Sequence, residues 1–119
     1  KAQMHGGIVQ GIGQALVEDI VYDADGQLIT GSLMDYCLPR ADDTCNMEII
    51  SAPTITGSNL IGAKGGGESG PTGALPATIN AVVDALKPLG VAHIDMPATP
   101  QRIWQTIQAA ARVNQTGGN

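Results

Sequence analysis

The sequence Gly62-Ala63-Lys64-Gly65-Gly66-Gly67-Glu68-Ser69-Gly70 places one carboxylate in a stretch that has almost no side chains. Ordered glycine costs about 1 kcal/mol relative to alanine in a regular element, so such a stretch is a poor way to build a core. It is useful where the backbone must approach another group closely. The groups here that can do chemistry are Glu68, Lys64, Ser69 and the backbone N–H donors. The stretch therefore predicts an acid or base held beside a bound cofactor.

Composition limits the chain to one small domain with an aliphatic core. Its 119 residues include no phenylalanine, one tryptophan and two tyrosines, so Ile, Leu, Val, Met and Ala must fill the interior. The net charge of −5 and the pI near 4.6 argue against nucleic acid as a partner, because binding a phosphate backbone requires clustered Lys and Arg. The basic residues are scattered and form no patch.

Cysteine and histidine are too few for a metal centre built by this chain alone. Cys37 and Cys45 have the spacing of neither a zinc knuckle nor a redox pair, so we expect free thiols in a reducing compartment. Two cysteines and two histidines cannot hold an iron–sulfur cluster or an ordinary structural zinc ion. No apolar run reaches the ~20 residues of a membrane span, so we expect a soluble, cytoplasmic protein. A chain that begins at Lys1, directly before a predicted helix, is expected to be a fragment or a processed subunit.

The first predicted element is an amphipathic helix over residues 3–21. Apolar side chains recur in it at i, i+4 spacing, namely at Met4, Ile8, Ile12 and Leu16. A second row of small residues, Gly7, Gly11 and Ala15, runs beside the apolar row. Such a face allows another backbone or a flat ligand to lie against the helix. The spacing alone does not choose between tight packing and ligand contact.

The rest of the chain mixes strand and helix signals. Residues 21–34 predict a hairpin, and residues 47–52 and 91–95 predict short strands. A core-facing helix that begins near Pro71 or Pro76 is predicted from the spacing of Leu75, Ile79, Val82, Val83 and Leu86. The last helix is predicted to start at Thr99 and Pro100, with Trp104 anchoring it on the core. We therefore predict an α+β fold, a two-layer module of helices packed on a small mixed sheet. A flexible polar tail is expected over residues 114–119.

Two functional alternatives remain open at this point. Residues 65–70 satisfy the pattern G-x-G-x-x-G, which is typical of a dinucleotide-binding βαβ unit. Three observations argue against this alternative. Residues 58–62 have too few branched apolar residues for a buried parallel strand, and Asp95 lies farther past Gly70 than the usual ribose-binding acid. The negative charge of Glu68 would also stand where the anionic pyrophosphate should bind. The second alternative is a non-catalytic interaction module, which requires an exposed apolar surface in place of a cofactor cleft.

The order of several motifs favours a specific family. Residues 62–70, together with residues 3–16 (QMHGGIVQGIGQAL), closely resemble the end of the molybdenum-binding subunit of the xanthine dehydrogenase and aldehyde oxidase family. The resemblance continues through residues 34–43 (MDYCLPRADD) and 97–104 (PATPQRIW), so it covers nearly the whole chain. It is strongest to bacterial members similar to the large subunit of aerobic carbon monoxide dehydrogenase. The resemblance implies that residues 1–113 form the C-terminal molybdopterin-binding subdomain of a molybdenum hydroxylase.

The resemblance also implies residue roles. Glu68 matches the family's catalytic base, which takes a proton during hydroxylation of an electron-poor substrate carbon, and desolvation in a closed site can raise the pKa of such a carboxylate. Gln3 matches a glutamine that hydrogen-bonds the molybdopterin. The backbone of Gly65, Gly66 and Gly67 is expected to lie against the cofactor, although Gly66 replaces a small apolar residue that is usual there. Lys64 is expected either to neutralise a cofactor phosphate or to form a structural ion pair. No residue is expected to bind a metal directly.

The expected cofactor is molybdenum with molybdopterin, in its cytosine dinucleotide form, bound by the intact enzyme and not by the isolated chain. Iron–sulfur clusters and FAD are expected on other domains or subunits. The remainder of the molybdenum subunit is the expected partner, and the substrate is expected to be a small molecule such as an aldehyde, an N-heterocycle or carbon monoxide. The isolated chain is expected to be inactive.

Overall fold

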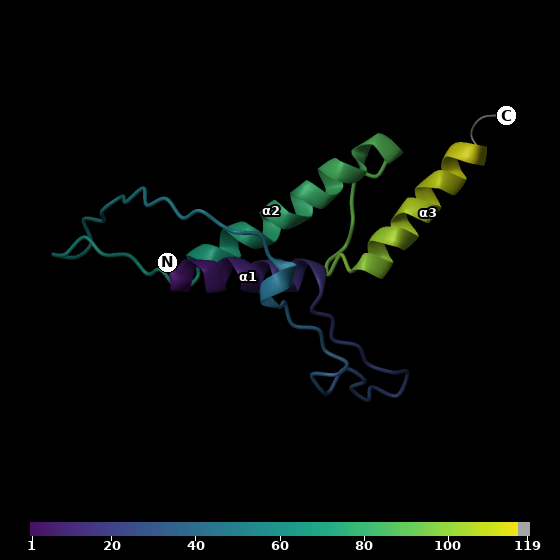
Figure 1. Cartoon of the computed structure of the whole chain (residues 1–119), viewed down its shortest axis with the longest axis horizontal. Coiled ribbons are helices and arrows are strands. Elements are labelled where there is room, and N and C mark those ends of the chain that lie inside the picture. Colours follow the sequence, from purple (N-terminus) through teal and green to yellow (C-terminus); the bar gives the residue numbers. More distant parts are fainter. Residues whose placement is uncertain (117–119) are drawn as a thin grey trace.

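The regular structure of this chain is helical (Figure 1). The computed structural model describes the backbone of residues 1–116 and the side chains of residues 1–113. Its helices are α1 (Ala2–Leu16), α2 (Ser69–Leu86) and α3 (Pro100–Thr116), with short 3-10 helices η1 (Ala41–Asp43) and η2 (Lys87–Leu89). Because α3 continues through Thr116, residues 114–116 of the expected tail are helical, and residues 117–119 lie outside the described residues.

The predicted α+β fold is wrong, because the described residues form no β-sheet. Within them, the only strand-like pairing is one isolated antiparallel bridge between Tyr22 and Leu28, inside the predicted hairpin. Residues 47–52 and 91–95 are not strands. A strand needs a neighbour that accepts and donates its ladder hydrogen bonds, and a two-stranded ribbon alone is marginal. Without strands on either side of α2, the βαβ alternative for residues 65–70 has no structural support.

The first two helices lie side by side and run in the same direction. Gly7 of α1 faces Gly70 of α2, and one turn later Gly11 faces Ala74. A Cβ built on Gly70 would lie 2.6 Å from the carbonyl carbon of Gly7. The small-residue row of α1 is therefore a helix-packing face. The predicted helix was five residues too long, because α1 ends at Leu16, where the N–H groups of Val17 and Glu18 both bond the carbonyl oxygen of Gly13.

Most of the hydrophobic core lies in the second half of the chain, where the end of α1 also contributes Ala15 and Leu16. Val91, Ile94 and Ala98 are buried between the last turns of α2 and one side of α3. As the sequence predicts, Thr99 caps α3: its hydroxyl oxygen accepts the N–H of Arg102 at 3.2 Å. The prediction that Trp104 anchors this helix is wrong, since its side chain is 60% exposed. The smaller Ile103 and Ile107 take that place.

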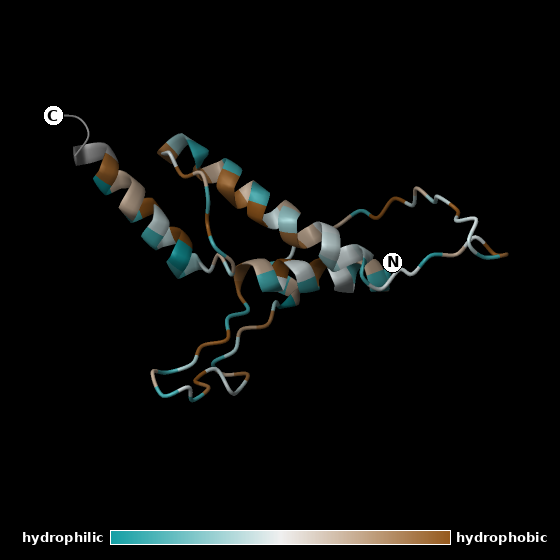
Figure 2. Cartoon of the chain, turned by 180° about the vertical axis from the view of Figure 1, so that it is seen from behind, coloured by the Kyte–Doolittle hydropathy of each residue, from teal (hydrophilic) through white to brown (hydrophobic). Residues whose placement is uncertain are grey.

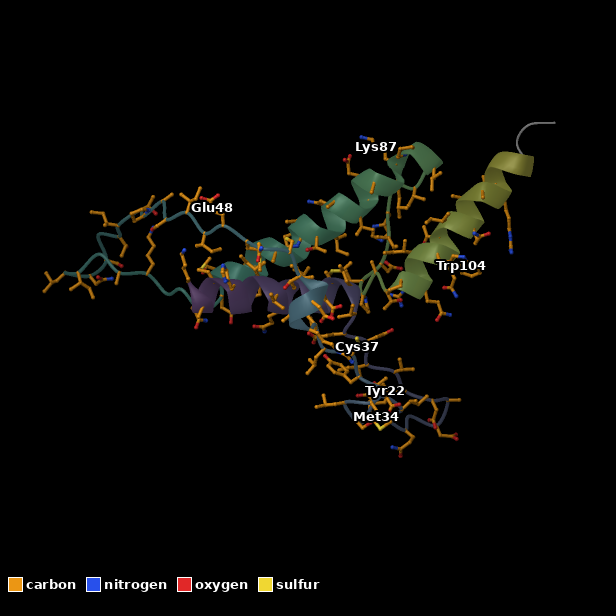
Figure 3. All side chains as sticks on the ribbon, viewed as in Figure 1. Tyr22, Met34, Cys37, Glu48, Lys87 and Trp104 are labelled. Atoms are coloured by element: carbon orange, nitrogen blue, oxygen red, sulfur yellow. The ribbon has the colours of Figure 1, made fainter. Side chains whose placement is uncertain are left out.

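Two long non-helical segments extend away from the helices (Figure 1). We call residues 17–40 the first excursion and residues 44–67 the second excursion. Figure 2 shows hydrophobic residues along both, and Figure 3 shows Tyr22 and Met34 on the first. Met34 is 96% exposed and Ile55 is 86% exposed. The Cα radius of gyration is 18.8 Å, well above the roughly 13–14 Å of a compact domain of this length. The excursions therefore lack the packing that a compact domain would give them.

Candidate functional site

The predicted site residues gather where α1 and α2 begin. Glu68 is the N-cap residue of α2, where its backbone has φ −92° and ψ −2°, and its side chain is exposed. Its carbonyl oxygen accepts the N–H of Thr72 at 3.2 Å. The next residue, Ser69, lies against α1: its hydroxyl is 3.2 Å from the sulfur of Met4. Glu68 and Gln3 are therefore each one residue from this contact between the two helices.

Two helix N-termini meet at this end of the helix pair. Neither α1 nor α2 has an acidic residue in its first turn, and neither N-cap side chain bonds to a backbone N–H. The first-turn N–H groups of a helix carry partial positive charge and bind acceptors. A carboxylate at the N-cap of α2 therefore lies in a favourable field. Chemically, this end of the helix pair offers one carboxylate, the amide of Gln3 and a set of backbone donors.

The glycine-rich loop leaves its backbone open. A Cβ built on Gly65, Gly66 or Gly67 would meet no atom within 4 Å. Nothing in the described part of the chain therefore requires glycine at these positions. Their small size leaves space beside the loop that a ligand or another segment can occupy.

The second excursion holds the loop from its upstream side. The Asn59 side chain accepts the N–H of Ala63 at 3.0 Å and donates to its carbonyl oxygen at 2.8 Å. Gly62 has φ +65°, a conformation that other residues rarely adopt. The Lys64 ammonium donates to the hydroxyl of Thr54 at 2.8 Å. Sequence reasoning missed this clamp, because a hydroxyl ten residues upstream gives no recognisable pattern.

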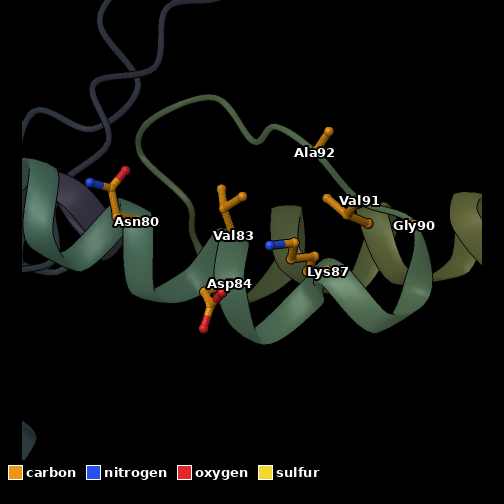
Figure 4. A pocket seen from close by; sticks show the side chains of 7 residues that line it. All are labelled: Asn80, Val83, Asp84, Lys87, Gly90, Val91 and Ala92. Atoms are coloured by element: carbon orange, nitrogen blue, oxygen red, sulfur yellow. The ribbon is translucent and has the colours of Figure 1, made fainter.

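His5 is the least satisfied side chain near this end. Its Nε2 atom is buried and has no hydrogen-bond partner among the described residues. It lies on α1 beside a hollow that residues 39–41 and 44–47 help to line. The separate hollow in Figure 4, of about 390 Å³, lies at the far end of α2 and includes Asp84 and Lys87. That hollow contains none of the predicted site residues.

Two further observations concern the described residues as a set. Residues 1–113, whose side chains are described, contain no group of three or more His, Cys, Asp or Glu placed to hold a metal ion. Both Cys37 and Cys45 are free thiols, as the sequence predicts, and both are exposed. Across the same part of the chain, none of the helices combines the length and apolarity needed to cross a bilayer.

A side-chain hydrogen bond joins the start of the first excursion to its end. The phenol of Tyr36 donates to the Glu18 carboxylate at 2.5 Å. This hydrogen bond, followed by desolvation and the negative charge of Glu18, raises the pKa of Tyr36 above its ordinary value of 10.0. A raised pKa favours the neutral phenol in the folded state. The resulting stabilisation is present below pH 10 and is lost as the pH rises through the folded-state pKa.

We expect an absorbance titration of tyrosinate to show this coupling. The difference between the wild-type curve and the Tyr36→Phe curve belongs to Tyr36, and its midpoint should lie above 10.0. Glu18→Gln removes the charge and should lower that midpoint. A midpoint that is the same with and without Glu18 would contradict the coupling.

Comparisons with known proteins agree on one family. The molybdopterin cofactor-binding domain family matches residues 1–45. The chain is 40% identical over 108 residues to the carbon monoxide dehydrogenase large chain of Hydrogenophaga pseudoflava, covering 91% of this chain and 13% of that protein. It is 43% identical over 103 residues to the nicotine 6-hydroxylase large subunit of Paenarthrobacter nicotinovorans, covering 87% of this chain and 13% of that protein.

A solved structure supports the same relationship. The crystal structure of quinoline 2-oxidoreductase from Pseudomonas putida 86 matches with a TM-score of 0.85 and 43% identity, over 90% of this chain and 14% of that one. At this sequence identity, the match indicates a common ancestor as well as a common fold. In each comparison this chain spans about one seventh of the relative's length.

Proposed function

Since the chain belongs to the carbon monoxide dehydrogenase and xanthine dehydrogenase family of molybdenum hydroxylases, and matches a segment of their molybdopterin-binding large subunit, we propose that it supplies the general base and part of the cofactor wall of such an enzyme. Glu68 is the proposed base. Gln3, Lys64 and the backbone of Gly65, Gly66 and Gly67 are the proposed cofactor contacts. The activity is that of an oxidoreductase acting on a small molecule such as an aldehyde, an N-heterocycle or carbon monoxide.

One contact carries the proposal: Ser69 of α2 meets Met4 of α1. It joins two stretches that are far apart in the sequence and that the family resemblance assigns to one site. Gln3 precedes Met4 and Glu68 precedes Ser69, so the proposed cofactor ligand and the proposed base lie at the same end of the helix pair. A dinucleotide site would not require this pairing of the two glycine-containing stretches.

The residues at this end fit a molybdopterin cofactor. The side chains absent from Gly65, Gly66 and Gly67 leave space along the loop, and the Gln3 amide can both donate and accept hydrogen bonds. The bond from Lys64 to Thr54 uses one of three ammonium protons, so two remain for an anionic group. When bound, the cofactor supplies the redox chemistry. The chain's own contribution is to orient the cofactor through Gln3 and the loop, and to accept a proton at the Glu68 carboxylate.

The remaining parts of the enzyme are proposed to come from other domains or subunits. These parts are the rest of the molybdenum subunit, the iron–sulfur clusters and FAD, and the cofactor is proposed to be the cytosine dinucleotide form. The exposed apolar side chains of both excursions support a covering partner, as the notably exposed Met34 and Ile55 illustrate. The chain spans 13% of the length of the carbon monoxide dehydrogenase large chain that it matches, which leaves most of a large subunit to supply that cover.

A cofactor-retention experiment tests the proposed wall. In the holoenzyme that contains this chain, Gln3→Ala should lower molybdenum and pterin content after dialysis by roughly 2- to 10-fold, the effect of losing about one hydrogen bond. Gln10→Ala is the matched control, because Gln10 is also an exposed glutamine of α1 but lies farther from α2's first turn. Equal cofactor content in the two variants would exclude Gln3 as a ligand.

A further inference from the structure

We propose that Ser69 is a positioning residue for Glu68, an inference that rests on the proposed role of Glu68 as base. The Ser69 hydroxyl donates to the carbonyl oxygen of Gly66 at 2.6 Å. This bond closes a short turn over residues 66–69, and Glu68 lies inside that turn. The hydroxyl thereby fixes the backbone from which the Glu68 side chain leaves.

The loop needs such a restraint because the upstream hydrogen bonds of Asn59 and Lys64 end before the three glycines. The bond from Ser69 is the only hydrogen bond that Gly65, Gly66 or Gly67 makes there. A Cβ built at any of these three positions would also meet no atom within 4 Å. Three successive glycines have more backbone freedom than any other tripeptide, so the entropy opposing a single loop conformation is large. A single strong hydrogen bond at the end of the loop limits that freedom where Glu68 begins.

Ser69 is itself held in place by both helices. Its hydroxyl also contacts the Met4 sulfur of α1, and the following residue, Gly70, is buried against the backbone of Gly7. The donor that restrains the loop is therefore attached to the most closely packed contact of the helix pair. On the other side of Glu68, the Thr72 N–H holds the Glu68 carbonyl oxygen. The base is restrained from both directions, and only the Ser69 restraint depends on a side chain.

The chain provides a matched control for losing such a hydroxyl. Thr78 lies on the same helix, and its hydroxyl donates to the carbonyl oxygen of Ala74 at 2.7 Å. That bond is of the same chemical type but remains within α2 and does not reach the loop. Removing it tests whether any lost hydroxyl of α2 affects the site.

The experiment measures kcat, KM, cofactor content and hydrogen exchange in the holoenzyme. Ser69→Ala should lower kcat by about 10-fold, because small errors in the placement of a reacting group have effects of this size or larger. KM and molybdenum content should stay within about twofold of wild type, since the exposed Ser69 side chain contributes little to folding. Ser69→Thr keeps the hydroxyl and should restore kcat, and Thr78→Val should leave kcat unchanged. Amides of residues 65–68 should exchange faster in Ser69→Ala alone.

The double variant separates this inference from the proposed function. If Ser69 acts through Glu68, adding Ser69→Ala to Glu68→Gln should not lower the residual turnover further. An undiminished 10-fold loss in that background would overturn the inference, and so would a normal kcat in Ser69→Ala. Full turnover in Glu68→Gln would instead overturn the base assignment itself. An inactive Glu68→Gln beside a normal Ser69→Ala would overturn the positioning role and leave the proposed function standing.

Discussion

Replacing Glu68 by glutamine should lower kcat of the holoenzyme by ~100-fold or more and leave its molybdenum content at the wild-type level. Glutamine has nearly the same shape as glutamate, so the N-cap conformation and the packing of α2 against α1 should persist. It cannot accept a proton at neutral pH, and loss of a general base has an effect of this magnitude. Steady-state kinetics with metal analysis on the same preparation makes the measurement.

Glu48→Gln is the control for this substitution. Glu48 is also an exposed glutamate, and it lies on the second excursion, outside the turn that ends in α2 (Figure 3). Its replacement changes the net charge equally and should leave kcat unchanged. If Glu68→Gln retained wild-type turnover, or lost it only in proportion to lost molybdenum, Glu68 would not be the base.

Gly70→Ala should prevent the close approach of α1 and α2. A methyl group at this position would lie 2.6 to 2.7 Å from three backbone atoms of Gly7 and Ile8, which cannot rotate away as a side chain can. We expect a loss of about 3 kcal/mol in the free energy of unfolding, the upper range for overpacking a close contact. Thermal denaturation of the holoenzyme, followed together with cofactor release, measures this loss.

Gly73→Ala provides the opposite expectation on the same helix. A Cβ at Gly73 would meet no atom within 4 Å, and alanine has the higher helix propensity. This variant should be as stable as wild type or more stable, by up to about 1 kcal/mol. Equal stability of Gly70→Ala and Gly73→Ala would contradict the packing of the two helices described here.

Much of the helical structure follows from local sequence signals. The apolar i, i+4 row of residues 4–16 predicts α1, and the Thr99-Pro100 pair correctly marks the start of α3. The predicted strands failed for a physical reason. Residues 47–52 and 91–95 have the apolar character of strands, but a sheet depends on partners that are not adjacent in the sequence. No such partner lies beside them in the described residues.

The candidate site was predicted only in part. The glycine-rich stretch and the family resemblance together identified Glu68 and Gln3, and their roles stay predictions until the variants are measured. The contacts that surround them were not predictable. The bond from Lys64 to Thr54 and the bond from Ser69 to Gly66 depend on how the backbone turns, which local propensities do not specify.

The sequence by itself determined the family, the three helices and the one carboxylate in the glycine-rich stretch, because these depend on residue type and on spacing along the chain. Only the tertiary structure decided why the small-residue row exists and where the two glycine-containing stretches meet. Gly7 and Gly70 are 63 positions apart, yet their backbones touch, which only the absence of both side chains allows. That contact brings Met4 to Ser69 and places Gln3 and Glu68 at the same end of the helix pair.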